Sequence, residues 1–222
     1  YDLTDKKCNF KELRSKVGMV FQYPEYQLFE ETVEKDIAFG PRNLGMSEEE
    51  IKTAVTHAME CVGLSDKYRK KSPFELSGGQ KRRVAIAGVI AMRPKVLILD
   101  EPTAGLDPKG RDRILSLIDS YHRAEKNTVL LVSHSMEDIA RYASKVLVMN
   151  HGEVFSYDTV EATFSHAEEI EKIGLSVPQI TKLFYALAEA GYTMDEHVYS
   201  VDRAQELLLQ MISGKRGASH AE

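Results

Sequence analysis

The chain is poor in cysteine and has no excess of positive charge, and both shortages narrow the classes of protein it can belong to. Its 222 residues carry a formal net charge of -5 and include two cysteines, Cys8 and Cys61, which lie far apart without metal-ligand spacing. A reduced, cytosolic protein is the simplest interpretation of that cysteine usage. The negative balance disfavours a nucleic-acid-binding protein, because such proteins usually carry a basic face.

Long apolar runs and a leader segment are also missing. No run approaches the roughly 18 residues that a membrane span requires, so we expect a chain that does not cross a bilayer but can dock on a protein that does. The chain starts at Tyr1 instead of a methionine, without a charged-then-apolar leader. We therefore expect the natural protein to continue upstream of this sequence.

Short apolar segments alternate with helical ones, and this alternation predicts an α/β layered fold. The run Lys-Val-Leu-Ile-Leu-Asp at 95–100 is typical of a strand buried on both faces, as in a parallel sheet. Further strands are predicted at 16–22, 128–133, 146–149 and 153–157, the last two as a hairpin around Asn150-His151-Gly152. Helices are predicted at 47–62, 79–92, 110–124 and 135–143.

The character of the sequence changes after about residue 158. No long buried strand follows, and helical patterns occupy 159–173, 178–190 and 201–213. We expect a core over 1–158, a small C-terminal helical subdomain over 159–213, and a flexible tail over 214–222.

Two adjacent acids, Asp100 and Glu101, end the apolar strand at 95–100. The carboxyl edge of an α/β sheet is where ligands bind. There the first acid could hold Mg²⁺ and the second could orient and deprotonate a water molecule. Taken alone, the pair is better explained as a solvated acidic turn after a strand.

A second cluster, Leu-Ser-Gly-Gly-Gln at 76–80, precedes a predicted helix. Glycines there let unpaired backbone N–H groups approach an anion such as a triphosphate, although a simple helix cap has the same composition. His134 follows the strand at 128–133 and Gln22 ends the strand at 16–22. His134 could donate to a phosphate oxygen or position a water molecule, and Gln22 could touch a metal or water. Taken alone, each is better explained as a structural residue.

The joint order of these motifs is more specific than any one of them. Gln22 is followed by Leu-Ser-Gly-Gly-Gln, then Leu-Ile-Leu-Asp-Glu-Pro-Thr at 97–103, Ala-Gly-Leu-Asp at 104–107, and His134. Over roughly residues 16 to 157 the sequence resembles the ABC transporter ATPases. The resemblance implies an α/β P-loop NTPase fold of the ABC ATPase type without its N-terminal part, with a mostly parallel sheet and a helical insertion over about 41–92.

The resemblance also implies a role for each motif residue. Asp100 looks like the Mg²⁺-binding aspartate and Glu101 like the general base for water. His134 looks like the switch histidine near the γ-phosphate. Gln22 looks like the loop glutamine that senses the metal and couples to the membrane partner.

The remaining motif residues are similar to those that act across a head-to-tail pair of ATPases. Asp107 looks like the loop aspartate that crosses the interface. The motif at 76–80 looks like the one that covers ATP held by the opposite subunit; its ATP-contacting residues are Ser77, Gly78, Gly79 and Gln80.

A narrower resemblance is to the ATP-binding subunits of energy-coupling factor transporters, which import vitamins or cobalt and nickel ions. It is carried by Phe-Gln-Tyr-Pro-Glu-Tyr-Gln-Leu-Phe at 21–29, Asp-Ile-Ala-Phe-Gly-Pro at 36–41, Pro-Phe-Glu at 73–75, and the tail segments 164–166 and 173–175. It implies ATP and Mg²⁺ as cofactors and a second ATPase subunit, most simply in a mixed pair. It also implies a transmembrane coupling subunit, a substrate-binding membrane subunit and a peripheral position on the cytoplasmic side of the cell membrane.

One motif of this family is absent from the sequence. No glycine opens a Gly-x-x-x-x-Gly-Lys-Ser/Thr phosphate-binding loop: Met46 follows the pair Gly40 and Gly45, and Arg111 follows Gly105 and Gly110. In the family this loop precedes the strand that leads to Gln22, so we expect it upstream of Tyr1. We also expect residues 1–222 alone not to hydrolyse ATP.

Two other functions remain open at this point. A non-transport ABC ATPase of DNA repair or translation shares the motif order, although such proteins usually carry long coiled-coil insertions or tandem halves. A catalytically inactive regulatory partner is disfavoured because Glu101 and His134 are both in place.

Overall fold

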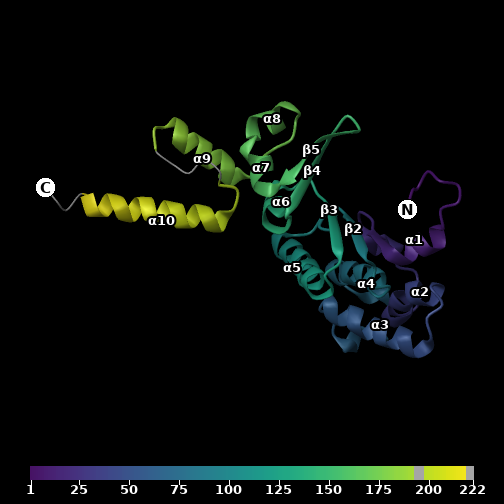
Figure 1. Cartoon of the computed structure of the whole chain (residues 1–222). Helices are drawn as coiled ribbons and strands as arrows, with labels where there is room; N and C mark the ends of the chain where they lie inside the picture. The colour runs from purple at the N-terminus through teal and green to yellow at the C-terminus, as the bar shows by residue number, and fades with distance from the viewer. Residues whose placement is uncertain (193–197, 219–222) are drawn as a thin grey trace. The chain divides into compact units, whose positions relative to one another are not determined.

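The computed structural model describes residues 1–192 and 198–218, with only the backbone described from residue 214 onward. The chain divides into two compact units, Tyr1–Val132 and Ser133–Glu222, and each is described by itself. Figure 1 shows the helices and strands of both units. The boundary expected near residue 158 between the core and the C-terminal subdomain stays a prediction.

The first unit is built on a parallel sheet, as the sequence predicts. Its strands β1 (Val17–Val20), β2 (Val96–Asp100) and β3 (Thr128–Val132) lie in the order β1-β2-β3 and are all parallel. The side chains of Val20, Leu97 and Leu99 are fully buried in the core. Because β2 lies between β1 and β3, the strand that ends at the acid pair is the central one.

The strand predicted at 16–22 is shorter in the structure. Lys16 belongs to helix α1 (Phe10–Lys16), and β1 ends at Val20. The chain leaves the sheet after Val20 because Tyr23 adopts a left-handed conformation, with φ of 54°, and Pro24 opens the 3₁₀ turn η1 (Pro24–Gln27). Gln22 therefore lies in the loop after β1, and the expectation that it ends the strand is wrong.

Four further helices complete the first unit: α2 (Val33–Asn43), α3 (Glu48–Cys61), α4 (Gly78–Ile90) and α5 (Pro108–Glu125). The last three match the predictions within about two residues at each end. Two 3₁₀ turns, η2 (Asp66–Tyr68) and η3 (Pro73–Glu75), connect α3 to α4. A capping box starts α3, because Glu50 accepts the Ser47 N–H at 2.8 Å and donates its own N–H to the Ser47 hydroxyl at 3.3 Å.

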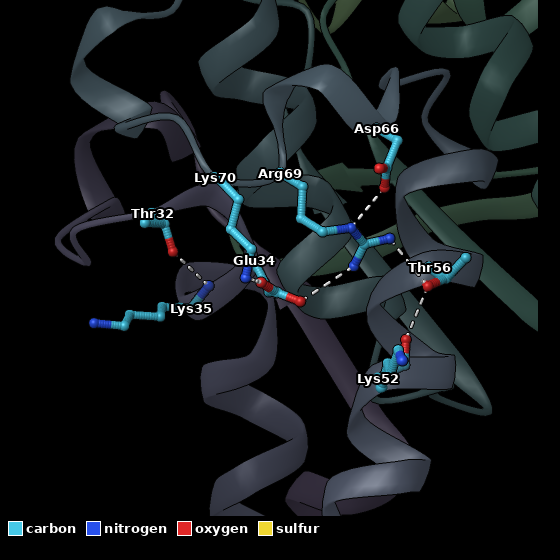
Figure 2. Close-up of polar contacts among 8 residues, drawn as sticks. All are labelled: Thr32, Glu34, Lys35, Lys52, Thr56, Asp66, Arg69 and Lys70. Carbon is cyan, nitrogen blue, oxygen red and sulfur yellow. Dashed lines mark hydrogen bonds and ion pairs between the residues drawn. The ribbon is translucent and has the colours of Figure 1, made fainter.

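An arginine holds the connection between α3 and α4 to its surroundings (Figure 2). The Arg69 guanidinium lies 2.6 Å from Asp66, 3.0 Å from the Thr56 hydroxyl and 3.4 Å from Glu34. Lys70 reaches the second carboxylate oxygen of Glu34 at 2.6 Å, and its hydrogen bond is the main reason why the pKa of Glu34 lies below its usual value. Arg69 thus joins η2, α2 and α3.

Gly18 in β1 lies closer to its neighbours than any other residue type would allow. A Cβ atom at this position would lie 2.5 Å from the Val89 Cγ1 atom and 3.0 Å from the Pro94 Cγ atom. Neither neighbour can rotate away, because Val89 is β-branched and Pro94 is a ring. We expect Gly18→Ala to lower the free energy of unfolding by about 1–3 kcal/mol through overpacking, as measured by urea denaturation.

Gly88 in α4 supplies the matched control. A Cβ atom there would meet only the Asp36 carbonyl oxygen at 3.9 Å and the Ile37 Cα at 4.0 Å, which is ordinary van der Waals contact. We expect Gly88→Ala to raise the free energy of unfolding by up to about 1 kcal/mol, because alanine favours a helix more than glycine does. Equal effects of the two substitutions would contradict the packing argument.

The second unit begins with α6 (Met136–Tyr142) and the antiparallel hairpin of β4 (Lys145–Asn150) and β5 (Glu153–Thr159), which confirms the predicted turn at 150–152. Its described residues then form α7 (Val160–Ser165), α8 (Ala167–Lys172), α9 (Gln179–Glu189) and α10 (Val201–Ala218).

Two boundaries in this unit differ from the sequence expectation. The helix expected at 159–173 is divided at His166, whose φ of -98° and ψ of 41° are not helical. The helix expected to end at residue 213 continues to Ala218, because glycine weakens a helix without stopping it. Of the flexible tail expected at 214–222, residues 219–222 lie outside the described part of the chain. Within the described ranges, no helix is both long and apolar enough to cross a membrane.

Candidate functional site

The loops that follow β1 and β2 emerge at the same edge of the parallel sheet. Val20 pairs with Leu99 in register, so Gln22 and Glu101 each come two residues after a matched pair. Asp100 pairs with Val132 and is the last residue of β2. The structure therefore brings Gln22, Asp100 and Glu101 to the carboxyl edge, where parallel sheets bind their ligands.

Glu101 has an uncommon backbone conformation at this edge. Its φ of 46° lies in the left-handed region, which is costly for a residue with a side chain. Two hydrogen bonds hold it there: its N–H donates to the Val132 carbonyl at 3.0 Å, and its carbonyl accepts the Ala104 N–H at 3.1 Å. These two hydrogen bonds thus fix the backbone that carries the Glu101 side chain.

A buried ion pair that sequence reasoning missed supports the same edge. Arg82 of α4 is 2% exposed and donates to both carboxylate oxygens of Glu25, at 2.9 and 2.6 Å. Its Nη1 atom also donates to the carbonyls of Ala104 at 2.7 Å and Pro102 at 3.3 Å. The available sequence signal was a pair of arginines next to the apolar stretch that begins at Val84, but nothing local named their partners.

The Arg82–Glu25 pair makes the free energy of unfolding depend on pH. Burial opposes ionisation of Glu25, but the hydrogen bond and charge of Arg82 outweigh it, so the pKa of Glu25 is lowered from its usual 4.5. A carboxyl with a lowered folded pKa stabilises the protein above its unfolded pKa and loses that contribution as pH falls through the folded value.

We therefore expect Glu25→Gln to reduce the free energy of unfolding at pH 7 and to lose less additional stability between pH 6 and pH 3 than the natural protein does. Chemical denaturation at each pH provides the measurement. Parallel losses in the two proteins would contradict this assignment.

The motif at 76–80 forms the start of α4. Ser77 is the N-cap residue, and its N–H donates to the Gln80 side-chain oxygen at 2.9 Å. A Cβ atom at Gly78 or Gly79 would meet no atom of the described residues within 4 Å outside its own helix turn. No contact among the described residues requires glycine at these positions, so the space before them is open to a ligand.

Asp107 has a structural role within the chain. It is the N-cap residue of α5, and its Oδ1 atom accepts the Gly110 N–H at 2.6 Å. A Cβ atom at Gly110 would lie 2.8 Å from that oxygen, so any other residue there would require the Asp107 carboxylate to shift. The predicted action of Asp107 across a subunit interface stays a prediction.

His134 follows the end of β3 by two residues and belongs to the second unit. The predicted approach of His134 to Asp100 and Glu101 therefore stays a prediction.

The donor set at the sheet edge suits Mg²⁺ shared with a nucleotide. In the described residues, no three His, Cys, Asp or Glu side chains gather into a metal site. Mg²⁺ is usually bound through one or two carboxylates with substrate phosphates and water completing the octahedron. One carboxylate and one amide oxygen, from Asp100 and Gln22, fit that pattern.

Comparison with known proteins points to one family. Residues 2–104 match the family model described as ABC transporter. The energy-coupling factor transporter ATP-binding protein EcfA2 of Caldanaerobacter subterraneus subsp. tengcongensis is 59% identical over 215 residues, covering 97% of this chain and 75% of the relative.

Solved structures agree with this match. The cbiO1 protein of Clostridium perfringens, described as part of the ABC transporter complex cbiONQ, superposes with a TM-score of 0.65 at 40% identity and covers 78% of this chain and 69% of its own. The dimeric cassette MJ0796, described in a post-hydrolysis state bound to ADP and Pi, superposes with a TM-score of 0.59 at 28% identity, covering 70% and 68%.

Proposed function

Because this chain belongs to the energy-coupling factor transporter ATP-binding proteins of the ABC transporter family, we propose that it powers the uptake of vitamins or transition-metal ions across the cell membrane. The observation that carries the proposal is the 59% identity over 97% of the chain. It favours a transport subunit over an ABC ATPase of DNA repair or translation. The parallel sheet adds support, because it places Gln22, Asp100 and Glu101 at one edge.

The acid pair has two different tasks in this proposal. Asp100, with Gln22, holds Mg²⁺, which when bound neutralises charge on the β- and γ-phosphates of ATP. Glu101 orients a water molecule and takes its proton as the water attacks the γ-phosphorus, while the bond from that phosphorus to the β-phosphate oxygen breaks and ADP and phosphate leave. His134 donates a hydrogen bond to the γ-phosphate.

The start of α4 serves a second nucleotide. Ser77, Gly78, Gly79 and Gln80 cover the γ-phosphate of ATP held by a partner ATPase in a head-to-tail pair, and the open space before Gly78 and Gly79 supports this. Asp107 lies at the same interface. The dimeric MJ0796 cassette with ADP and Pi supports such a pair. We propose a mixed pair, with a different ATPase as the partner.

We propose that the surface after Gln22 binds a transmembrane coupling subunit. That coupling subunit also binds a substrate-binding membrane subunit. Large side chains are unusually exposed there: Tyr26 is 84% exposed and Phe29 56% exposed. Phe29 also packs edge-on against Phe39 of α2, with ring centroids 4.9 Å apart. This surface would place the subunit on the cytoplasmic side of the membrane, as a peripheral protein.

The 222 residues by themselves are proposed to be inactive, because the sequence holds no Gly-x-x-x-x-Gly-Lys-Ser/Thr loop to neutralise the β- and γ-phosphates. Turnover of ATP by the purified 222-residue chain alone would contradict this.

The function itself is tested by purifying the full-length protein from its membrane and reconstituting the complex in liposomes. We expect co-purification with membrane subunits and ATP-dependent uptake of a vitamin or metal ion. Co-purification with nucleic acid or ribosomes instead would favour the non-transport class.

A further inference from the structure

Arg82 lies where three separate segments of the first unit meet. It belongs to α4, which begins at the motif proposed to cover a partner's ATP. Its two hydrogen bonds to Glu25 reach η1, in the loop that follows Gln22. Its hydrogen bonds to Pro102 and Ala104 reach the segment that follows Glu101.

Burial makes this junction hard to separate. Arg82 is 2% exposed and the Glu25 side chain 17% exposed, so neither charge can exchange its partner for bulk water. Removing one member of a buried pair leaves an uncompensated charge, which is strongly unfavourable. The bidentate geometry also fixes the orientation of the guanidinium and not only its position. The two loops therefore cannot move independently while Arg82 stays buried.

A continuous series of contacts leads from one proposed functional residue to the other. Gln22 stands three residues before Glu25, and the ring of the intervening Tyr23 lies 5.9 Å from the Arg82 guanidinium. On the other side, the Ala104 carbonyl accepts from Arg82, while the Ala104 N–H donates to the Glu101 carbonyl at 3.1 Å. That second bond is one of the two that hold Glu101 in its left-handed conformation.

We propose that Arg82 is a positioning residue that locks the loop carrying Gln22 to the segment carrying Glu101, so that displacement of this loop is transmitted to the backbone of the base. The proposal rests on the ATPase function proposed above. It assigns to Arg82 and Glu25 no contact with nucleotide. Their effect acts through Ala104 and the orientation of Glu101.

The test compares Arg82→Gln, Glu25→Gln and the double variant in the full-length subunit assembled with its partners. Arg69→Gln is the matched control, because Arg69 also bridges three segments but joins only η2, α2 and α3 (Figure 2). Steady-state kinetics give kcat and KM for ATP. Hydrogen exchange at the Ala104 N–H reports on the Glu101 segment without requiring activity.

We expect each single variant at Arg82 or Glu25 to lower kcat by about tenfold or more, since small misplacements of catalytic groups are costly, with KM for ATP changed less than about threefold. The Ala104 N–H should exchange about tenfold faster even in Glu25→Gln, whose substitution lies in another segment. The double variant should lose little more than either single variant, because the two residues act as one unit. Arg69→Gln should leave kcat and Ala104 exchange near the natural values.

Three results would overturn the proposal: equal losses of kcat in Arg82→Gln and Arg69→Gln, multiplicative losses in the double variant, or unchanged exchange at Ala104 in Glu25→Gln. A natural complex without ATPase activity would refute the proposed function instead. In that case the exchange measurement alone still decides whether Arg82 locks the two loops.

Discussion

Replacing Glu101 by glutamine should lower steady-state ATP hydrolysis of the assembled transporter by about 100-fold or more, the range expected when a general base is removed. Glutamine has nearly the same shape and keeps a hydrogen-bonding oxygen, but it cannot take up the proton of the attacking water. The backbone bonds of Glu101 to Val132 and Ala104 do not involve the side chain, so the fold should be unaffected. ATP binding should persist, because Asp100 and the start of α4 are untouched.

The measurement combines ATP turnover, ATP binding and thermal unfolding of the full-length protein. Glu49→Gln is a suitable control, since it makes the same chemical change at an exposed position of α3. Turnover by Glu101→Gln within about threefold of the control would show that Glu101 is not the base, because a lost base costs far more.

The second large effect is expected at the start of α4. Gly78→Asp should abolish ATP-driven pairing of the ATPases and reduce turnover by about 100-fold, because a carboxylate would face the partner's γ-phosphate where N–H donors are needed. The same substitution should not harm folding. The added Cβ atom would meet no atom of the described residues within 4 Å outside its own helix turn, and an acid in the first turn of a helix is favourable.

This opposition between function and stability is what the experiment measures. Sedimentation with ATP reports the pairing, and thermal unfolding reports the stability. Gly78→Ala adds a side chain without a charge, so it separates the effect of side-chain volume from the effect of charge. We expect it to reduce ATP turnover less than Gly78→Asp does. Normal ATP hydrolysis by Gly78→Asp would show that the proposed role of this motif is wrong. A lower unfolding temperature than that of the natural protein would contradict the packing argument instead.

Several features of the protein could be predicted from local sequence alone. The run at 95–100 predicts β2 because a continuous apolar run is typical of a strand in a parallel sheet. Burial on both faces is not found, since Val96 and Ile98 are only half-buried. Ser47 and Glu50 predict the start of α3 because their side chains satisfy backbone N–H groups only a few residues away. The order of Gln22, the motif at 76–80, the acid pair and His134 predicts the family, which the comparisons confirm.

Other features follow only from packing between distant segments. Helix α2 contains Pro41 near its end, and tertiary burial of Val33, Ile37 and Ala38 favours it over the break that Gly40 and Pro41 suggest. The early end of β1 depends on Tyr23 and on the turn that follows it. The paired geometry of the sheet edge depends on strand register, which no single segment contains.

The sequence by itself determined which residue types follow the strands of the sheet, because the residue types and their order are local facts of the chain. The tertiary structure decided how that chemistry is held in place. Glu25 and Arg82 are 57 residues apart, and a charge at either position reads as a solvated surface residue until α4 packs beside η1. Only in the folded core does each charge lose water and need the other. The buried pair then connects the loop of Gln22 to the backbone of Glu101.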